Sequence, residues 1–416
     1  MKIGIFTDTY HPSINGVVSV VDILRHNFTL LGHEVFVFAP GEGLRIEQTA
    51  DVHVYKFPTF KGGLFNDLNT PLFFPPMLLN DIKKLDLDVI HFLTPGQVGL
   101  MGLYAAHELK IPVVSEYCTD LFEYVEHYPF ALPVLITALL LLPLAIPMTK
   151  DQLFELYRSS RPRLGIGKWN KSLIRDLMTI LHSSCNTVIV HSKKSARQLA
   201  SWQKDEFNYR TYLIPTGVDP LPKANQTERD EFCKKYKISP TDEVVIYVGR
   251  LSQEKNLDLL IDMMPDLIKK RPNAKLIFVG DFDYRETLER NAKKSNNARI
   301  IFTGRMPREK LGIPLSIAKV FAFPSLSDTQ GLVLHEAALA GVPIVMCDPL
   351  VSEVVKNGEN GFYCKNNAKD MANKIAAILN DDKLQKSMSA KGKIIAGRLS
   401  EKAQAKKIID LYKKIS

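Results

Sequence analysis

Short apolar runs alternate with helix-like stretches along the first half of the chain. The runs are rich in Val, Ile and Phe and are bounded by turn residues, as buried β-strands are. Longer stretches with helical periodicity, such as Val18–Leu31 and Gly99–Leu109, separate several of them. Strands that alternate with helices pair in parallel through right-handed crossovers. The predicted strands are Ile3–Phe6, Glu34–Phe38, Val52–Phe57, Val89–Phe92, Val113–Ser115 and Thr187–Val190.

A second alternating series follows the Pro- and Lys-rich segment Ile214–Asn225, which we predict to be a hinge. Its predicted strands are Val244–Val248, Lys275–Val279, Arg299–Thr303, Val320–Pro324 and Ile344–Cys347, and its helices lie around Leu257–Lys270, Tyr284–Ser295 and Leu334–Ala340. A chain of 416 residues is also longer than a domain with a single hydrophobic core usually is. We therefore expect two Rossmann-like, doubly wound α/β domains, 1–215 and 216–398, with ligands bound at the carboxyl ends of their strands. The amphipathic stretch 399–416 predicts a final helix that packs back on the first domain.

One apolar stretch breaks this rhythm. No charged residue occurs from Tyr128 to Thr149, and Phe130–Met148 is almost entirely aliphatic. Its length would suit a membrane span, but three prolines (Pro133, Pro143 and Pro147) interrupt it, and its flanks belong to one predicted domain. A buried helical hairpin and a segment inserted in one membrane leaflet both remain open, and we favour the second.

Charge and cysteine content add to this picture. Most of the net charge of +9 lies between Lys150 and Arg210, a segment that contains 12 Lys and Arg but only 5 Asp and Glu. A basic surface beside the apolar stretch suits an anionic membrane, whereas nucleic-acid binding would rest on charge alone, so we expect no nucleic-acid partner. The five cysteines show neither paired nor zinc-binding spacing, which is typical of free thiols in a reducing compartment. We expect a cytoplasmic protein, peripheral on the cytoplasmic face of a membrane. His11 and His91 are scattered and are interpreted as ordinary hydrogen-bonded histidines.

The segment with the most specific pattern runs from Phe323 to Ala337. A predicted strand ends at a Pro-Ser turn, and a helix begins near Gly331. The first turn of a helix presents free backbone N–H groups and the positive end of the helix dipole, which suits a diphosphate. Asp328 precedes this helix and Glu336 follows two turns into it, so two carboxylates can accept hydrogen bonds from sugar hydroxyls.

Several motifs in the same order resemble family 4 of the retaining glycosyltransferases, which have the GT-B fold. They are Asn15-Gly16-Val17, Pro215-Thr216-Gly217-Val218-Asp219, Val248-Gly249-Arg250-Leu251 with Lys255-Asn256, and Asp328 to Glu336. The resemblance covers nearly the whole chain and is closest to the membrane-associated lipid glycosyltransferases of the family. It implies transfer of a hexose from a nucleotide-sugar, with a UDP-sugar favoured.

The resemblance also assigns donor-site roles. Arg250 and Lys255 would neutralise the two phosphates in place of a metal, so neither metal nor cofactor is expected. Asp328 would face the transferred sugar and complete the catalytic set, while Glu336 would accept hydrogen bonds from the ribose. Gly16 would allow backbone to approach the diphosphate. The remaining donor-site residues would be Thr329, Gln330, Gly331 and Leu332 at the diphosphate or sugar, and Gly304, Arg305 and Met306 near the base.

This chain departs from the family pattern twice. Asp328 stands where the family usually has Glu, which shortens its reach by one methylene. Cys118 stands where lipid glucosyltransferases of the family carry a His. Asp8 could point into the acceptor site or cap Thr9-Tyr10. The acceptor-site residues implied are Asp8, Cys118, Thr119, Asp120 and Tyr124.

The apolar stretch favours a membrane lipid such as diacylglycerol as the acceptor. A soluble or polysaccharide acceptor is one alternative, and a non-catalytic, membrane-associated nucleotide-sugar binder is another.

Overall fold

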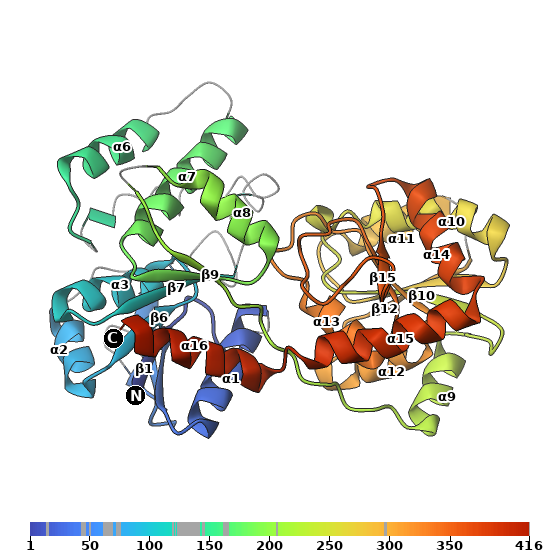
Figure 1. Ribbon diagram of the computed structural model, residues 1–416, viewed down its shortest axis with the longest axis horizontal. Coiled ribbons are helices and arrows are strands. Elements are labelled where there is room, and N and C mark those ends of the chain that lie inside the picture. The colour runs from blue at the N-terminus through green and yellow to red at the C-terminus, as the bar shows by residue number, and fades with distance from the viewer. Residues whose placement is uncertain are drawn as a thin grey trace. The chain divides into compact units, whose positions relative to one another are not determined.

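The computed structural model describes residues 1–13, 16–42, 47–49, 51–60, 70–71, 76–118, 120, 122, 142–143, 146–160, 166–204, 207–294 and 298–415. The chain divides into two compact units (Figure 1). Unit 1 comprises 1–216 together with 401–416, and unit 2 comprises 217–400. Residues 214–225 between them have no regular secondary structure. The prediction of two parallel-sheet α/β domains is confirmed.

Unit 1 is built on one sheet, whose described strands follow the order β3-β4-β2-β1-β6-β7-β8-β9, with β5 added on β4. The pairs along the path from β4 to β9 are parallel, and the two-residue strands β3 and β5 pair antiparallel with β4. The strands are β1 (Lys2–Phe6), β2 (Glu34–Glu42), β3 (Glu47–Gln48), β4 (Val54–Phe60), β5 (Thr70–Pro71), β6 (Val89–Phe92), β7 (Val113–Tyr117), β8 (Thr187–Val190) and β9 (Thr211–Leu213).

Helices cover both faces of this sheet. Ile3 and Ile5 pack in one cluster with residues of α1 and α16, and the other face carries a cluster that includes Phe6 and Phe92 with residues of α3 and α7. The last helix of the chain, α16, thus lies beside α1 in unit 1, as predicted for the C-terminal segment (Figure 1). The helices of unit 1 are α1 (Gly16–Leu30), α2 (Pro76–Leu85), α3 (Gln97–Leu109), α6 (Lys150–Ser160), α7 (Ile166–Ser183), α8 (Lys193–Trp202) and α16 (Glu401–Ile415).

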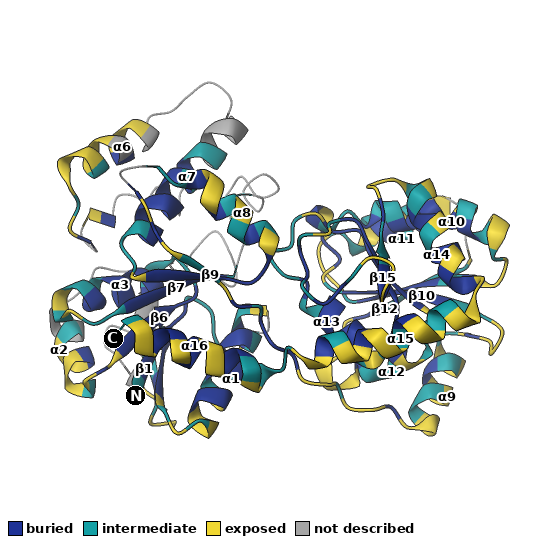
Figure 2. Ribbon diagram, viewed as in Figure 1, coloured by how far each residue is buried: buried dark blue, intermediate teal, exposed yellow. Residues whose placement is uncertain are grey.

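Unit 2 contains a fully parallel sheet, whose described strands follow the order β12-β11-β10-β13-β14-β15. The inner strands β10, β11, β13 and β14 are almost entirely buried, and the edge strands β12 and β15 are mostly half-buried, whereas the helices expose one side (Figure 2). The strands are β10 (Glu243–Val248), β11 (Ala274–Val279), β12 (Ile300–Gly304), β13 (Val320–Phe323), β14 (Ile344–Met346) and β15 (Gly361–Tyr363). The helices are α9 (Gln226–Lys235), α10 (Asp258–Lys270), α11 (Arg285–Lys294), α12 (Gly312–Ile317), α13 (Leu332–Ala340), α14 (Ala368–Leu379) and α15 (Asp382–Gly397), with short 3₁₀ helices η2 (Gln253–Lys255) and η3 (Arg308–Lys310).

The predicted strands all form, with ends that differ by a few residues. The expected strand at Val52 begins only at Val54, because Val52 is 59% exposed in the preceding turn. Four strands that the pattern did not predict, β3, β5, β9 and β15, are two or three residues long and lie at the outer edges of the two sheets. An edge strand this short carries too few buried residues to show a period.

Candidate functional site

The strand order of unit 2 contains one reversal that marks a ligand site. The chain runs outward from β10 to β11 and β12, then returns to place β13 on the other side of β10. In doubly wound sheets, ligands bind outside the carboxyl ends of the strands at such a switch point. Arg250 and Lys255 follow β10, and the segment from Asp328 to Gly331 follows β13. The topology therefore brings the predicted phosphate-binding and sugar-binding residues to one edge of the sheet.

Two glycines allow the loops at this edge to pack backbone against backbone. Gly249 has a φ of 153° and Gly280 a φ of 148°, a region that side chains disfavour. A Cβ atom at Gly280 would lie 1.8 Å from the carbonyl oxygen of Gly249. The Gly249-Arg250 pair of the sequence motif thus combines a backbone requirement with the cation that follows it.

Arg250 is held by three neighbours rather than extended freely into solvent. Its Nη2 lies 3.5 Å from Glu254 Oε1, and its guanidinium carbon lies 5.1 Å from the centre of the Phe282 ring. The Tyr247 hydroxyl donates to its backbone oxygen. Glu254 is itself buried and accepts a hydrogen bond of 2.6 Å from Ser252 Oγ. Half of the Arg250 side chain remains exposed, which leaves guanidinium N–H groups for an anion.

Lys255 forms an ion pair with Asp328, the carboxylate that the family resemblance predicts to face the transferred sugar. Its Nζ lies 2.8 Å from Asp328 Oδ1, and both side chains are largely buried. Two hydrogen bonds join the same loops, from Ser327 Oγ to Glu254 O and from Asn256 Nδ2 to Pro324 O. The loops after β10 and β13 therefore form one connected edge. An ammonium group has three donors, so Lys255 can contact a phosphate while it holds Asp328.

The helix start predicted near Gly331 is confirmed. Helix α13 begins at Leu332, and its N-cap residue, Gly331, has no side chain that could occupy the first-turn N–H groups. Glu336 lies within α13 and is 7% exposed. Arg308 Nε donates to Glu336 Oε1 at 2.8 Å. Sequence reasoning missed Arg308, because nothing in the local pattern connects it with a glutamate 28 positions away.

Burial raises the pKa of Glu336, and the neighbouring Arg308 guanidinium offsets this only in part. Burial also raises the pKa of Tyr247 well above its usual range, with the negative charges of Asp328 and Glu254 adding to the effect. The edge formed by the loops after β10 and β13 is therefore a place where low dielectric strengthens electrostatic contacts.

Some of the other predicted donor-site residues also lie at this edge of the unit 2 sheet. Thr329 and Gln330 are half-buried in the loop that precedes α13. Gly304 is the last residue of β12, and Arg305 after it is exposed. Met306 is half-buried against the core of unit 2.

In unit 1 the switch point lies between β1 and β6. Gly16 is the first residue of α1 and is exposed, and a Cβ atom added to it would meet no described side chain within 4 Å. The Asp8 carboxylate accepts from the Gly96 and Val98 backbone N–H groups at 2.9 and 2.6 Å and from Thr94 Oγ1. The Asp8 side chain therefore caps the N-terminus of α3, a role that neither sequence-based alternative for Asp8 included. Burial raises the pKa of Asp8 although these hydrogen bonds oppose the rise.

A buried polar cluster at the carboxyl ends of β7 and β8 is the main feature that the sequence did not predict. Glu116 Oε2 lies 2.8 Å from His91 Nε2, and Glu116 Oε1 lies 2.9 Å from His191 Nε2. His91 Nδ1 lies 2.5 Å from the Tyr412 hydroxyl, which belongs to α16. The interpretation of His91 as an ordinary hydrogen-bonded histidine is confirmed, and so is that of His11, which bonds Asp22. The members of the cluster come from strands and helices far apart in sequence, so no local spacing could reveal it.

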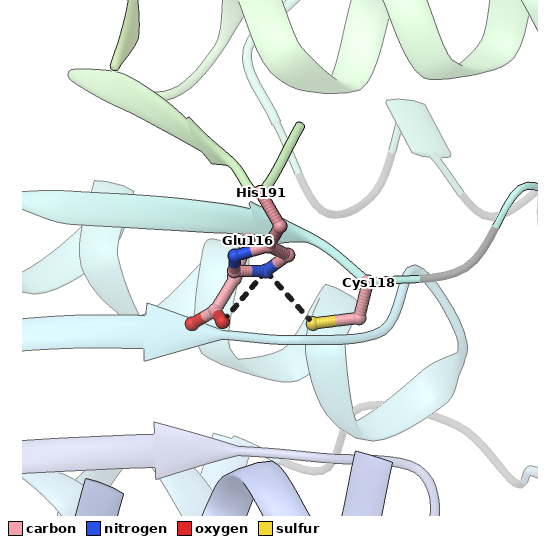
Figure 3. A group of neighbouring side chains, drawn as sticks. All are labelled: Glu116, Cys118 and His191. Carbon is pink, nitrogen blue, oxygen red and sulfur yellow. Dashed lines mark hydrogen bonds and ion pairs between the residues drawn. The ribbon is translucent and has the colours of Figure 1, made fainter. Parts of the chain in front are cut away.

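Cys118 joins this cluster, with its Sγ 3.7 Å from His191 Nε2 (Figure 3). Asp120 is buried and accepts hydrogen bonds from Tyr117 and Gln198, so its side chain belongs to an internal network. The other two predicted acceptor residues, Thr119 and Tyr124, lie outside the described residues.

Charge determines the ionisation of this cluster. Burial alone would raise the pKa of Glu116, but the charge of His191 and the contacts with both histidines bring it below its usual range. Burial would lower the pKa of His191, and Glu116 raises it overall. Burial raises the pKa of the Cys118 thiol well above its usual value, with a further contribution from Glu116.

The apolar stretch 129–149 is described only at its end. Leu142 and Ile146 are fully or almost fully buried in the core of unit 1. Among the described residues, no helix is both long and apolar enough to cross a membrane. The helix that follows, α6, buries Leu156 and exposes three large apolar side chains: Leu153, Phe154 and Tyr157, at 42, 64 and 59%.

Comparison with known proteins shows which protein families the chain resembles. Residues 14–220 match the family described as Glycosyltransferase Family 4, and residues 228–395 match Glycosyl transferases group 1. The alpha-monoglucosyldiacylglycerol synthase of Acholeplasma laidlawii is 26% identical over 99% of this chain and 96% of its own length. A synthase of the same name from Streptococcus pneumoniae is 27% identical over 83% of this chain and 70% of its own length.

Solved structures agree with the fold. The sucrose-phosphate synthase of Thermosynechococcus elongatus has a TM-score of 0.69 at 19% identity and covers 99% of this chain and 98% of its own. Anabaena HepE in complex with UDP-glucose has a TM-score of 0.68 at 18% identity, with both chains covered completely. WaaG, a glycosyltransferase involved in lipopolysaccharide biosynthesis, has a TM-score of 0.63 at 14% identity and covers 99% of both chains. The architecture is therefore GT-B.

Proposed function

The chain belongs to glycosyltransferase family 4, and from this premise we propose that it transfers a hexose from a UDP-sugar to a membrane lipid with retention of anomeric configuration. The observation that carries the proposal is the connected edge of unit 2, where Arg250, Lys255 and the start of α13 meet at the switch point. A diphosphate leaving group requires this combination of cations and free backbone N–H groups.

The donor is held by charge and by directed hydrogen bonds. Arg250 and Lys255 neutralise the diphosphate, and the first turn of α13 donates to its oxygens. Glu336 is fixed by Arg308 and accepts hydrogen bonds from the ribose hydroxyls. Asp328 is positioned by Lys255 and accepts from the sugar hydroxyls. UDP is the favoured nucleotide because HepE, which shares the fold, is in complex with UDP-glucose.

The reaction is a front-face substitution at the anomeric carbon. The bond from this carbon to the diphosphate oxygen breaks, and a bond to the acceptor hydroxyl oxygen forms on the same face of the sugar. The acceptor proton passes to the departing diphosphate, so the products are a glycoside and a nucleoside diphosphate. Catalysis comes from support of the developing negative charge and from positioning. No metal is required, because two side-chain cations do the neutralising.

The lipid acceptor is supported by the relatives and by the surface of unit 1. Two relatives are named as monoglucosyldiacylglycerol synthases. Leu153, Phe154 and Tyr157 form an exposed apolar surface on α6, directly after the uncharged stretch that ends at Thr149. We propose that this α6 surface contacts the lipid bilayer and that the basic stretch beginning at Lys150 favours anionic headgroups.

The test of function uses the full-length protein with UDP-glucose and vesicles that contain diacylglycerol and anionic lipid. The expected product is a monoglucosyl lipid, detected by mass spectrometry, with an α-linkage in its NMR spectrum, and EDTA should leave the rate unchanged. Transfer only to water-soluble acceptors would refute the lipid assignment. Binding of UDP-sugar without transfer or hydrolysis would instead indicate a non-catalytic binder.

The test of membrane contact changes the α6 surface and leaves the buried Leu142 and Ile146 intact. Phe154→Glu should weaken binding to anionic vesicles about tenfold or more, because burial of a Phe side chain contributes roughly 1.5–3 kcal/mol. Ile394→Glu is the matched control, since Ile394 is also an exposed apolar residue on a helix but lies in unit 2. Equal vesicle binding by both variants in a sedimentation assay would exclude the α6 surface.

A further inference from the structure

Three potential metal ligands converge in unit 1 where β7 and β8 end. Glu116 is in β7, Cys118 follows that strand directly, and His191 follows β8 (Figure 3). Their ligand atoms, a carboxylate oxygen, a thiol sulfur and an imidazole nitrogen, all lie within 4.8 Å of one another. Glu116 and His191 are buried, and Cys118 is half-buried. These three side chains are called the unit 1 triad below.

A hydrogen bond to the backbone fixes the orientation of the His191 ring. Its Nδ1 lies 2.9 Å from the carbonyl oxygen of Ile214, which can only accept, so Nδ1 carries a hydrogen. In the neutral ring the other nitrogen, Nε2, then presents a lone pair, and this atom faces Glu116 and Cys118. Metal-binding histidines commonly have this arrangement, with the far nitrogen donating to a carbonyl or carboxylate.

The Glu116 carboxylate needs a positive partner at the same point. Its side chain is completely buried, and neither oxygen accepts a hydrogen bond of normal geometry within the described residues, although His91 and His191 approach to 2.8 and 2.9 Å. His91 Nε2 approaches Oε2 of Glu116, and His91 Nδ1 contacts the Tyr412 hydroxyl. A carboxylate oxygen and an imidazole lone pair cannot approach this closely without a proton or a cation between them.

We propose that the unit 1 triad binds one divalent metal ion of the zinc type. Thiolate, imidazole and carboxylate are zinc ligands, whereas nitrogen and sulfur donors disfavour Mg²⁺ and Ca²⁺. In a tetrahedral zinc site the ligand atoms lie roughly 3.3–3.7 Å apart, given bonds of about 2.0–2.3 Å. The Cys118 to His191 distance of 3.7 Å fits, and the Glu116 to His191 distance of 2.9 Å has to open by a few tenths of an ångström.

The charge of the ligands and the space beside them are both compatible with a divalent ion. The metal replaces the thiol proton and the proton between Glu116 and His191, and both protons are released to solvent, so one carboxylate and one thiolate balance the two positive charges. Glu116 and Cys118 also line a small cavity with Phe92, Ser115 and Met178. This cavity offers room for a water molecule as the fourth ligand. This ion takes no part in stabilising the leaving group of the proposed transfer, which is neutralised by the cations of unit 2.

The test is a titration of the full-length, metal-free protein with Co²⁺, followed by its absorption spectrum. Co²⁺ takes the place of zinc, and its bond to a thiolate gives an intense near-ultraviolet charge-transfer band. One Co²⁺ per chain should produce this band, and Zn²⁺ should abolish it by displacement. Cys118→Ser should lose the band while keeping its thermal unfolding midpoint, because serine is close to cysteine in size.

Cys185→Ser is the matched control, since Cys185 is another half-buried free thiol of unit 1 but donates to Leu181 O, away from the triad. It should retain the band. Absence of a band in the unaltered protein would show that Glu116 and His191 share only a proton, and would overturn the proposal. So would a band that survives in Cys118→Ser. Neither result depends on transferase activity, so the proposed function stands or fails separately.

Discussion

Lys255 and Lys275 show how the same residue pair serves different purposes in unit 2. Each lysine is largely buried and pairs with an aspartate, Lys255 with Asp328 at 2.8 Å and Lys275 with Asp242 at 2.7 Å. Lys255 follows the carboxyl end of β10, whereas Lys275 lies near the amino end of β11, so the two pairs occupy opposite edges of one parallel sheet. The first edge also carries Arg250 and the start of α13, which follow β10 and β13.

Lys255→Ala is expected to lower kcat/KM about 100- to 1,000-fold, the loss that follows removal of one donor from a developing oxyanion. Lys275→Ala should leave kcat/KM within about twofold, since this lysine lies far from the diphosphate, while breaking a comparable ion pair. Steady-state kinetics with UDP-glucose, beside urea unfolding of each variant, measures both effects. Equal kinetic losses in the two variants would show that the ion pair matters only for stability.

Glu336 gives a prediction about pH. Because burial raises its pKa above the ordinary 4.5, the native state holds the proton more tightly than the unfolded chain does. Ionisation of this carboxyl therefore costs stability as pH rises from below about 4.5 toward neutral. The unfolding free energy of the unaltered protein, minus that of Glu336→Gln, should fall over this interval in urea titrations. A constant difference would mean that Arg308 cancels the effect of burial.

At the scale of single elements, helix α3 depends on a residue from a different strand. Gly96, its N-cap residue, has no side chain, and the cap comes from Asp8 after β1, 88 positions earlier. The two are neighbours because β1 pairs with β6. Spacing along the chain therefore could not identify this cap, whereas the parallel pairing explains it.

Asp8→Ala is expected to destabilise unit 1 by about 0.5–2 kcal/mol through loss of the N-cap. Asp8→Asn should recover only part of this, because the Gly96 and Val98 N–H groups bond to different oxygens of Asp8 and asparagine has a single acceptor oxygen. Urea unfolding followed by circular dichroism measures the difference. If the alanine variant is as stable as the original, the hydrogen bonds do not stabilise α3.

At the scale of the whole molecule, the chain leaves unit 2 after Ser400 and contributes its last helix to unit 1. Helix α16 buries Ile408 and Tyr412 completely against the sheet face that holds Ile3 and Ile5. Strand β1 and helix α16 thus share one hydrophobic core, so unit 1 needs segments from both sides of unit 2 in the sequence.

Ile408→Ala should lower the stability of unit 1 by about 2–5 kcal/mol, the usual cost of a cavity in a core. Unit 2 has its own core, so scanning calorimetry should show one transition moving to lower temperature and the other unchanged. If both transitions moved together, the two units would unfold as one. The exposed Lys406 on the same helix provides a control, since Lys406→Ala should move neither transition.

The sequence by itself determined the alternation of strands and helices, the two parallel sheets and the segments that meet at the carboxyl ends of β10 and β13. These features follow from short-range period and from the rule that parallel strands end at a common edge. The resemblance of Arg250, Lys255, Asp328 and Glu336 to a family supplied their proposed roles. Only the tertiary structure decided which side chains hold them: Asp328 for Lys255, and Arg308 for Glu336.

The same distinction applies in unit 1. The sequence marked Cys118 as a departure, but Glu116 and His191 gave no signal, because their positions are 75 residues apart and become neighbours only when β7 pairs with β8. Likewise, Tyr412 reaches His91 only because α16 returns to the first sheet. Periodicity reports which face of an element is buried, whereas contacts between distant segments depend on the packing of the whole fold.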